Sequence, residues 1–280
     1  ISKESRSNYN LTPFSVASTL NMDYLELHKG RQNYATVNYS YKVIRNGGVL
    51  KFLESMGYQF HNCSIFDFDK QPAYKYKAFL PYGIKLITSQ TFIGRLQEDF
   101  ESDIVDGRFG SALQKKLAYE NLHFNDEIID LTAKISGRRS QQPKFVYTHL
   151  MMPHYPYYYD SKSVPLPLEK LTHQNKSNSN DYIEYLQYSN KKILGLIDQI
   201  LASSPSAIIM LLSDHGFQNR ENNFNRKYDF MNLNAAYLPG RNNTGLYDSI
   251  TNVNQFRVFF NTYFNQHLPL LKDSTINVWD

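Results

Sequence analysis

Residues 207–216 read AIIMLLSDHG, an apolar run that is followed at once by a carboxylate and an imidazole. The run lies between Pro205 and Gly216, which is typical of a buried strand. Ligands of open α/β sheets collect beyond the carboxyl ends of the strands, so Asp214 and His215 stand where a metal ion can be held. Neighbouring strand residues point to opposite faces, and both reach one ion only if the chain turns, as Gly216 permits. The alternative is an ordinary capping carboxylate beside a structural histidine.

A second polar cluster follows another predicted strand. Residues 144–152 read KFVYTHLMM and lead into the segment PHYP at 153–156. The two prolines restrict the backbone on either side of His154, so the sequence predicts a rigid histidine on a loop beyond the strand. Such a position suits a substrate or metal contact, and an incidental place in an aromatic surface loop is the alternative. His149 lies inside the predicted strand and is expected to be buried and hydrogen-bonded.

The third cluster is N-terminal. Thr12 precedes Pro13, and a hydroxyl residue before a proline at the first helical position predicts a helix start with Thr12 as the N-cap. Val16, Thr19 and Leu20 are expected to face inward. A helix N-terminus has positive potential and free N–H groups, where a phosphoryl oxygen is also favoured. Capping and a functional role for Thr12 are therefore compatible.

The remaining pattern alternates helices with strands. The sequence predicts a short helix at 49–53, a strand at 58–63, helices at 91–100, 111–135 and 181–201, a strand at 232–238 and a helix at 253–264. Such alternation favours an α/β fold with a mainly parallel central sheet and helices on both faces. A length of 280 residues fits one large domain over residues 1–280.

The clearest helical pattern is the one at 181–201. We expect a cap at Asn180 or Asp181 and an apolar stripe that packs in the core. The stripe consists of Ile183, Leu186, Ile193, Leu194, Ile197 and Leu201.

Two polar segments flank the predicted strand ends. Residues 165–180 read as a solvated loop beside His154 that can rim a substrate entrance. Residues 220–227 follow the Asp-His pair, and their Arg220 and Arg226 are candidates for anion contacts. A solvated charged loop is the alternative for both arginines.

Composition limits the classes of partner. The 30 Lys and Arg residues exceed the 26 Asp and Glu residues by only 4 and are scattered along the chain. We therefore expect no nucleic acid partner, whereas an anionic lipid surface or a phosphorylated substrate is compatible with this charge. The single cysteine, Cys63, excludes an internal disulfide. No apolar run approaches the roughly 20 residues that a membrane helix needs.

Four motifs, taken together and in order, resemble those of a known family. They are SNYNLTPFSVASTLNMDYL at 7–25, FVYTHLMMPHYPYYYD at 145–160, IIMLLSDHG at 208–216 and TNVNQFRVFFNTYF at 251–264. The chain resembles the sulfatase-like branch of the alkaline phosphatase superfamily. Within that branch it is most similar to the extracytoplasmic domains of bacterial membrane proteins akin to lipoteichoic acid synthases and phosphoethanolamine transferases.

The resemblance implies a role for each clustered residue. Thr12 falls at the place of the nucleophile, whose oxygen also binds the metal, and Asp214 and His215 fall at metal-ligand positions. One divalent cation, Mn, Zn or Mg, is therefore the expected cofactor, since it would lower the pKa of the threonine hydroxyl. His154 falls at the histidine that contacts the transferred group or the leaving oxygen. His149 has at most a supporting role behind the metal ligands.

One departure from the family pattern concerns the start of the chain. Family members carry an acidic metal ligand at the end of an opening strand a few dozen residues before the nucleophile, and only eleven residues precede Thr12 here. We therefore expect an N-terminally truncated domain that lacks this strand and its carboxylate. The resemblance further implies membrane helices upstream of Ile1 and an extracytoplasmic location, periplasmic or at the cell surface.

These expectations favour a metal-dependent phosphoryl-type transferase or hydrolase that acts on a phosphodiester head group through a covalent Thr12 intermediate. Its substrate would be phosphorylated or lipid-linked and anionic. A sulfatase is the first alternative, but sulfatases oxidise a cysteine or serine to formylglycine, and the sequence after Cys63 lacks the proline and arginine of that motif. A non-catalytic sulfatase-like binding domain is the second alternative.

Overall fold

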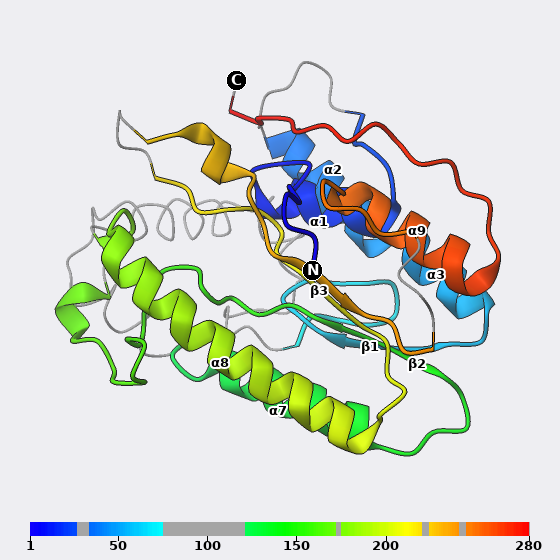
Figure 1. Cartoon of the computed structure of the whole chain (residues 1–280), viewed down its shortest axis with the longest axis horizontal. Coiled ribbons are helices and arrows are strands. Elements are labelled where there is room, and N and C mark those ends of the chain that lie inside the picture. The colour runs from blue at the N-terminus through cyan, green and yellow to red at the C-terminus, as the bar shows by residue number, and fades with distance from the viewer. Residues whose placement is uncertain (27–33, 75–120, 172–174, 220–223, 241–244, 280) are drawn as a thin grey trace, which may run out of the picture.

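The computed structural model describes residues 1–26, 34–74, 121–171, 175–219, 224–240 and 245–279. Its helices are α1 (Thr12–Asn21), α2 (Tyr34–Arg45), α3 (Gly48–Ser55), α7 (Phe124–Gly137), α8 (Ser179–Ser203) and α9 (Asn252–Phe264), with short 3₁₀ helices η1 (Leu168–Lys170) and η3 (Arg226–Asp229). Its strands are β1 (Gln59–Cys63), β2 (Lys144–Thr148), β3 (Ile209–Leu212) and β4 (Asn234–Tyr237). Helices α1, α2, α3 and α9 lie on one side of the strands, and α7 and α8 lie on the other (Figure 1). The chain thus has the expected α/β fold.

The described strands form two small sheets. β1 and β2 pair in parallel, with Gln59 opposite Lys144. β3 and β4 pair antiparallel, with Leu212 opposite Asn234, because β4 returns along β3 after a loop rather than after a crossover helix. The parallel pair matches the expected sheet, whereas the antiparallel direction of β4 does not follow from the sequence pattern. At their carboxyl ends β2 and β3 lead into the segments that carry His154 and Asp214.

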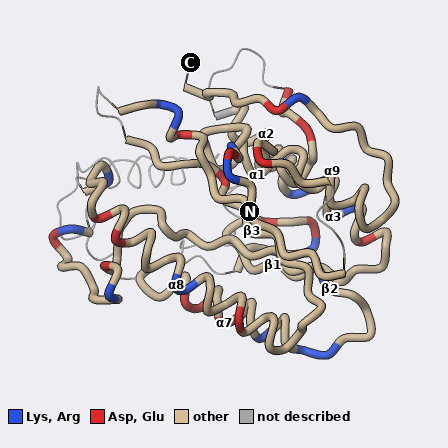
Figure 2. The backbone as a smooth tube through the Cα atoms, viewed as in Figure 1, with Lys and Arg blue, Asp and Glu red and all other residues tan. Residues whose placement is uncertain are grey.

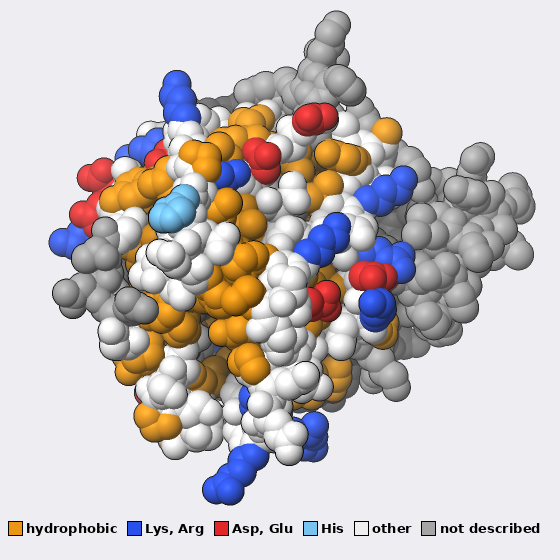
Figure 3. All heavy atoms as spheres, turned by 90° about the vertical axis from the view of Figure 1, so that its right-hand side faces the viewer, with side chains coloured by type: hydrophobic (Ala, Val, Ile, Leu, Met, Phe, Trp, Pro, Cys, Tyr) orange, Lys and Arg blue, Asp and Glu red, His pale blue; other side chains and the backbone are white. Residues whose placement is uncertain are grey.

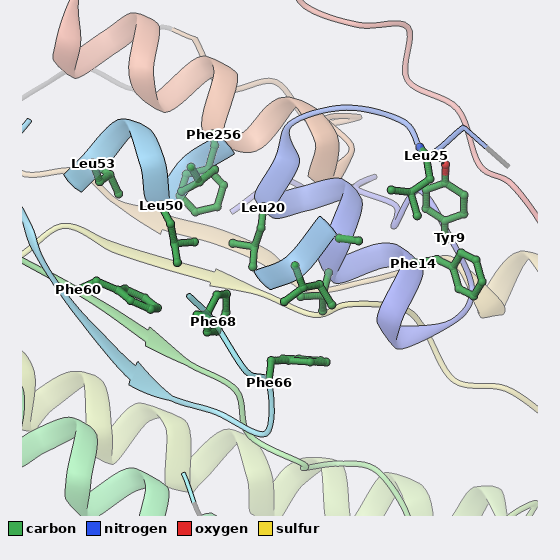
Figure 4. Close-up of a cluster of buried hydrophobic side chains, with 14 of the residues drawn as sticks. Tyr9, Phe14, Leu20, Leu25, Leu50, Leu53, Phe60, Phe66, Phe68 and Phe256 are labelled. Carbon is green, nitrogen blue, oxygen red and sulfur yellow. Dashed lines mark hydrogen bonds between the residues drawn. The ribbon is translucent and has the colours of Figure 1, made fainter. Parts of the chain in front are cut away.

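The larger hydrophobic core lies between β1 and helices α1, α2, α3 and α9. Leu20, Leu50 and Phe256 come from three of these helices, and Phe60 comes from β1 (Figure 4). Each of these side chains is at most 6% exposed. Burial of one such side chain contributes about 1.5–3 kcal/mol. This core fixes α1 against the sheet and so determines where the start of α1 lies.

The second core joins α7, α8 and the loop after β2. Ile129 of α7 and Tyr185 and Leu196 of α8 pack with Met152 and Tyr157 of the loop. All five side chains are buried. The loop that carries His154 is therefore held against α8 by apolar packing as well as by its prolines.

The segment before α1 is held by the C-terminal part of the chain. Asn8 donates to the hydroxyl of Thr251 at 3.0 Å and accepts from the N–H of Val253 at 2.7 Å. Asn10 accepts from the N–H of Val278 at 3.0 Å. Asn8 and Asn10 are fully buried, so loss of any of these bonds would leave a buried polar group without a hydrogen-bond partner. These bonds fix the approach of the chain to Thr12.

The first helix differs from the sequence prediction at its cap. Thr12 is its first helical residue and Leu11 is the N-cap, with no side-chain capping bond. Thr12 as N-cap is therefore wrong by one position, because Pro13 occupies the second helical position here rather than the first. Val16, Thr19 and Leu20 are buried as predicted. The Thr12 hydroxyl is consequently not used to cap its own helix.

The inward face of α8 is also not the predicted one. Ile183 and Leu194 are 48% and 60% exposed, whereas Tyr185, Tyr188 and Leu196 are buried. Tyrosine rings form most of this face because each ring buries a large apolar area and fits edge-to-face or stacked aromatic packing. Counting only aliphatic residues therefore missed the tyrosines of the buried face and included two exposed positions, while the other four stripe residues are half-buried.

Other element boundaries shift by a few residues. The N-cap of α8 is Asn178, which accepts bonds from the N–H groups of Asn180 and Asp181, the two residues predicted as caps. α2 occupies a polar, tyrosine-rich segment in which no element was expected. β2 ends at Thr148, four residues before the predicted end. The helix predicted at 91–100, the 111–120 part of the next one and Arg220 lie outside the described residues.

Charged side chains are scattered over the described surface. Lys and Arg are dispersed among Asp and Glu over the described backbone (Figure 2), and one face shows apolar side chains between isolated charges (Figure 3). Among the described residues no helix is long and apolar enough to cross a membrane. The described surface therefore has the mild and dispersed charge that the composition indicates.

Candidate active site

Thr12 and the strand-end pair, which are far apart in the sequence, meet in the structure. Oγ1 of Thr12 lies 3.2 Å from Nε2 of His215, across 203 residues of chain. The same Nε2 lies 3.5 Å from Oδ2 of Asp214. Ser15, one turn into α1, donates a hydrogen bond to the backbone carbonyl of Asp214 and ties the helix to the strand end. The packing of α1 thus places a hydroxyl beside a carboxylate and an imidazole.

The turn after β3 lets both strand-end side chains face Thr12. Oδ1 of Asp214 accepts from the N–H of His215 at 2.9 Å, and the N–H of Gly216 donates to the carbonyl of Asp229 at 2.9 Å. A Cβ atom at Gly216 would overlap the carbonyl oxygens of Tyr228 and Met231. Glycine is therefore needed here for the close approach of the 228–231 backbone.

The orientation of the His215 ring follows from its neighbours. Nδ1 of His215 lies 2.8 Å from the carbonyl oxygen of Gly216, which can only accept a hydrogen bond, so Nδ1 is the donor. Nε2 then faces the Thr12 hydroxyl. A histidine that donates from one ring nitrogen to a carbonyl is oriented to bind a metal ion through the other.

Asp214 is ionised in this setting. Burial raises the pKa of its carboxyl, but the interactions with His215 and His149 and the hydrogen bonds from Thr12 and the His215 N–H outweigh burial, so the pKa lies below its ordinary value. The side chains of Asp214 and His215 keep 24% and 17% of their surface exposed. An ionised carboxylate is therefore accessible to a small ligand.

The loop histidine lies within electrostatic range of the same group. Partial burial lowers the pKa of His154, and the charges of His215 and Lys176 lower it further, while the Tyr155 carbonyl and Asp214 oppose them. Nδ1 of His154 is bonded to the Tyr155 carbonyl, so Nδ1 carries the proton and Nε2 can accept one. His154 remains exposed to solvent. It is thus a neutral imidazole with an accepting nitrogen beside the site.

His149 supports the site from the end of β2. Its N–H donates to the carbonyl of Cys63 at 3.0 Å, which extends the parallel pairing by one residue. Its ring packs edge-on against Phe66, with centroids 5.0 Å apart. Burial lowers the pKa of His149, while the Asp214 charge raises it. His149 is therefore a neutral, packed neighbour of Asp214.

Asp229 is a site neighbour that the sequence did not indicate. It is 3% exposed, and its Oδ1 has no hydrogen-bond partner among the described residues. Its Oδ2 lies 3.7 Å from Nη1 of Arg226. Burial raises its pKa, while the charges of Arg226 and His215 oppose that shift. Arg226, a predicted anion contact, therefore faces a carboxylate of its own chain, and no periodicity or motif around 226–229 marks Asp229.

The three donors fit a divalent cation in type, and the distances from Nε2 of His215 to the other two donors fit in spacing. The donors supply a hydroxyl oxygen, a carboxylate oxygen and an imidazole nitrogen, which suit Zn or Mn. Ligands that share an ion at about 2.1 Å in a tetrahedral arrangement lie about 3.4 Å apart, close to the 3.2 and 3.5 Å observed here. The described residues contain no cluster of three His, Cys, Asp or Glu side chains, so Thr12 is needed as the third donor.

Comparison with known proteins identifies the family of the chain. The model of the Sulfatase family matches residues 4–259, which include Thr12, His154, Asp214 and His215. No curated protein and no solved structure matches the chain. Members of the Sulfatase family are hydrolases and transferases that typically depend on a metal. The chain therefore belongs to the Sulfatase family, within the alkaline phosphatase superfamily.

Proposed function

We propose that this protein is a metal-dependent phosphoryl-type transferase or hydrolase that acts on a phosphodiester through a covalent intermediate on Thr12. One observation carries the proposal: the Thr12 hydroxyl lies 3.2 Å from Nε2 of His215, at the start of a helix and beside an ionised carboxylate. A threonine hydroxyl is a weak nucleophile in water and needs such neighbours to react. Helix-start N–H groups also favour the negative charge of a phosphoryl oxygen.

Each side chain would have a defined task. Thr12, Asp214 and His215 would hold one divalent cation, which when bound would lower the pKa of the Thr12 hydroxyl and offset charge on the transferred group. The Thr12 hydroxyl would lose its proton to solvent, and its oxygen would attack phosphorus and displace one alkoxide, which leaves as an alcohol after taking a proton from solvent. The enzyme would then carry a phosphodiester bond to Thr12.

His154 would act in the second half of the reaction. Its Nε2 can accept a proton, so it would take the proton of the attacking water or acceptor alcohol as that oxygen bonds to phosphorus. The bond between phosphorus and the Thr12 oxygen breaks, Thr12 takes a proton from solvent, and His154 returns its extra proton to solvent. A water acceptor gives hydrolysis, and an alcohol acceptor gives transfer.

The position of Cys63 supports a phosphodiester over a sulfate ester. Sulfate-ester hydrolysis by formylglycine needs a cysteine or serine at the nucleophile position, which is oxidised to formylglycine, and the residue in contact with His215 is Thr12. Cys63 is fully buried at the end of β1, and burial raises the pKa of its thiol. We further propose that the protein resembles lipoteichoic acid synthases and phosphoethanolamine transferases in function. Its substrate would then be lipid-linked and anionic, and its location would be extracytoplasmic and membrane-attached.

Parallel assays of two ester classes test the proposal. With Mn²⁺ or Zn²⁺ present, the full chain should hydrolyse bis(p-nitrophenyl) phosphate in preference to p-nitrophenyl sulfate. Thr12→Ala should abolish turnover, Thr12→Ser should keep part of it, and trapped protein should carry the added mass on the peptide containing Thr12. Thr19→Ala is the matched control, because the Thr19 hydroxyl bonds to its own helix at 2.8 Å. Turnover of the sulfate alone would favour a sulfatase, and full activity of Thr12→Ala would refute the covalent mechanism.

A further inference from the structure

The loop before α8 is tied to both segments that carry site residues. The backbone carbonyl of Lys176 accepts from the hydroxyl of Tyr157 at 2.7 Å, and Tyr157 lies in the loop of His154. The carbonyl of Ser177 accepts from Nδ2 of Asn219 at 3.3 Å, four residues after His215. The backbone at 176–177 therefore bridges the two strand-end segments.

The start of α8 makes this bridge rigid. Oδ2 of Asp181 accepts from Asn175 and Asn178, each at 3.0 Å. Oδ1 of the same carboxylate accepts from the Lys170 ammonium at 3.0 Å. Asp181 is only 8% exposed. Hydrogen bonds thus fix the chain on both sides of Lys176.

The Lys176 side chain extends toward the histidine loop. Its Nζ lies 5.3 Å from the ring centroid of Tyr155, within cation–π range. The Tyr155 ring stacks on His154, with centroids 5.0 Å apart and planes 30° apart. The ammonium group is therefore directed over the residue next to His154. Its positive charge also lowers the pKa of His154, which agrees with this placement.

We propose that Lys176 is a substrate-binding residue, which holds the anionic group of the ester on the His154 side of the site. The inference rests on the proposed function and adds a specificity determinant to it. A cation held over an aromatic ring is preorganised, so little side-chain entropy is lost when an anion binds. Lys176 thereby makes the site selective for esters that keep a negative charge on the transferred group.

Binding of inorganic phosphate and turnover of the phosphodiester should be measured on the same variants. Lys176→Ala should weaken phosphate binding about tenfold in calorimetry and raise KM by a similar factor, while kcat changes less, since a uniform binding contact affects KM. Lys176→Arg should recover most of the affinity because it keeps the cation. The salt dependence of KM should also decrease in Lys176→Ala.

Lys227→Ala is the matched control, because Lys227 lies over the ring of Tyr228 at 5.0 Å in the same kind of pair. Its phosphate affinity and KM should equal those of the wild type. Unchanged phosphate affinity in a folded Lys176→Ala protein would overturn the inference, whether or not the wild type turns over the diester. A further outcome is a wild type that binds phosphate more tightly than Lys176→Ala and still shows no diester turnover. That result would support the role of Lys176 in anion binding and contradict the proposed catalytic function.

Discussion

Asp273 accepts hydrogen bonds from both the backbone N–H and the hydroxyl of Thr251, at 2.9 and 2.7 Å. Thr251 is the N-cap of α9, so this carboxylate lies at the positive end of the helix. Tyr247 and Asn254 donate to the same carboxylate at 2.7 and 3.1 Å. Burial raises the pKa of Asp273, but these hydrogen bonds outweigh burial, so the pKa lies below its ordinary value.

Asp273→Asn should therefore reduce stability in a pH-dependent way. Because the folded-state pKa is depressed, the carboxylate stabilises the fold above the unfolded pKa of about 3.9, and this contribution is lost as pH falls through the folded value. We expect Asp273→Asn to lower the free energy of unfolding by about 1–2 kcal/mol at pH 7, and its deficit relative to the wild type should shrink toward pH 3. Urea unfolding at both pH values measures this deficit. Asp248→Asn, at an exposed carboxylate nearby, is the control, and a deficit equal at both pH values would contradict the argument.

Asp214→Ala should remove divalent cation binding. The substitution deletes the only carboxylate of the three-donor cluster, and an ion held by a hydroxyl and an imidazole alone has no opposing charge. Calorimetric titration with Mn²⁺ should show affinity reduced by at least about tenfold, equivalent to about 1.4 kcal/mol. Asp248→Ala should bind as the wild type does. Equal Mn²⁺ affinity in Asp214→Ala and the wild type would show that the metal binds at another site.

His154→Ala should slow turnover while leaving cation binding unchanged. The imidazole contributes an accepting nitrogen to the reaction but is not one of the three donors, and loss of a general base costs about 10²–10⁴-fold in rate. Steady-state kinetics with the phosphodiester and a Mn²⁺ titration separate these two effects. His267→Ala, far along the chain, should keep full activity. Loss of cation binding in His154→Ala would instead assign His154 to the metal.

Gly216→Ala and Gly195→Ala should change stability in opposite directions. A methyl group at Gly216 meets the backbone of Tyr228 and Met231, which cannot retract without moving η3, so we expect a loss of about 2–4 kcal/mol. Gly195 lies within α8, and apart from its chain neighbours and the helix's own backbone no described atom lies within 4 Å of a Cβ placed there, so alanine should stabilise the helix by about 0.5–1 kcal/mol. Thermal unfolding compares the two. Similar shifts in both variants would refute the close-approach argument.

The sequence predicted the positions of helices and strands better than it predicted which side of a helix is buried. The apolar run at 207–212 contains β3, as a short apolar run between turn residues indicates, but the strand residues are half-buried rather than fully buried as predicted. The face of α8 was not predictable from aliphatic spacing, since tyrosines 185 and 188 make its buried side. The polar α2 segment likewise became a helix through tertiary packing, with Ile44 fully buried in the larger core.

The candidate site was predictable only where a motif marked it. The resemblance put Thr12, Asp214 and His215 together, whereas nothing local relates a helix start to a strand end 203 residues later. Asp229 and Lys176 lie in polar loops whose composition indicates solvent exposure. Their proximity to the histidines depends on the conformation of these segments. Such segments have no periodic sequence pattern from which a conformation could be predicted.

The bonds that join the chain's first ten residues to its last thirty have a kinetic consequence. Asn8 meets Val253 across 245 residues, and Thr12 meets His215 across 203, so both contacts carry the entropy cost of closing very long loops. Contacts of this range form late in folding. Partly folded chains can therefore contain α8 or the β1–β2 pair and still have no catalytic centre. An ion or anion that binds only the assembled centre would selectively stabilise the native state against every such intermediate.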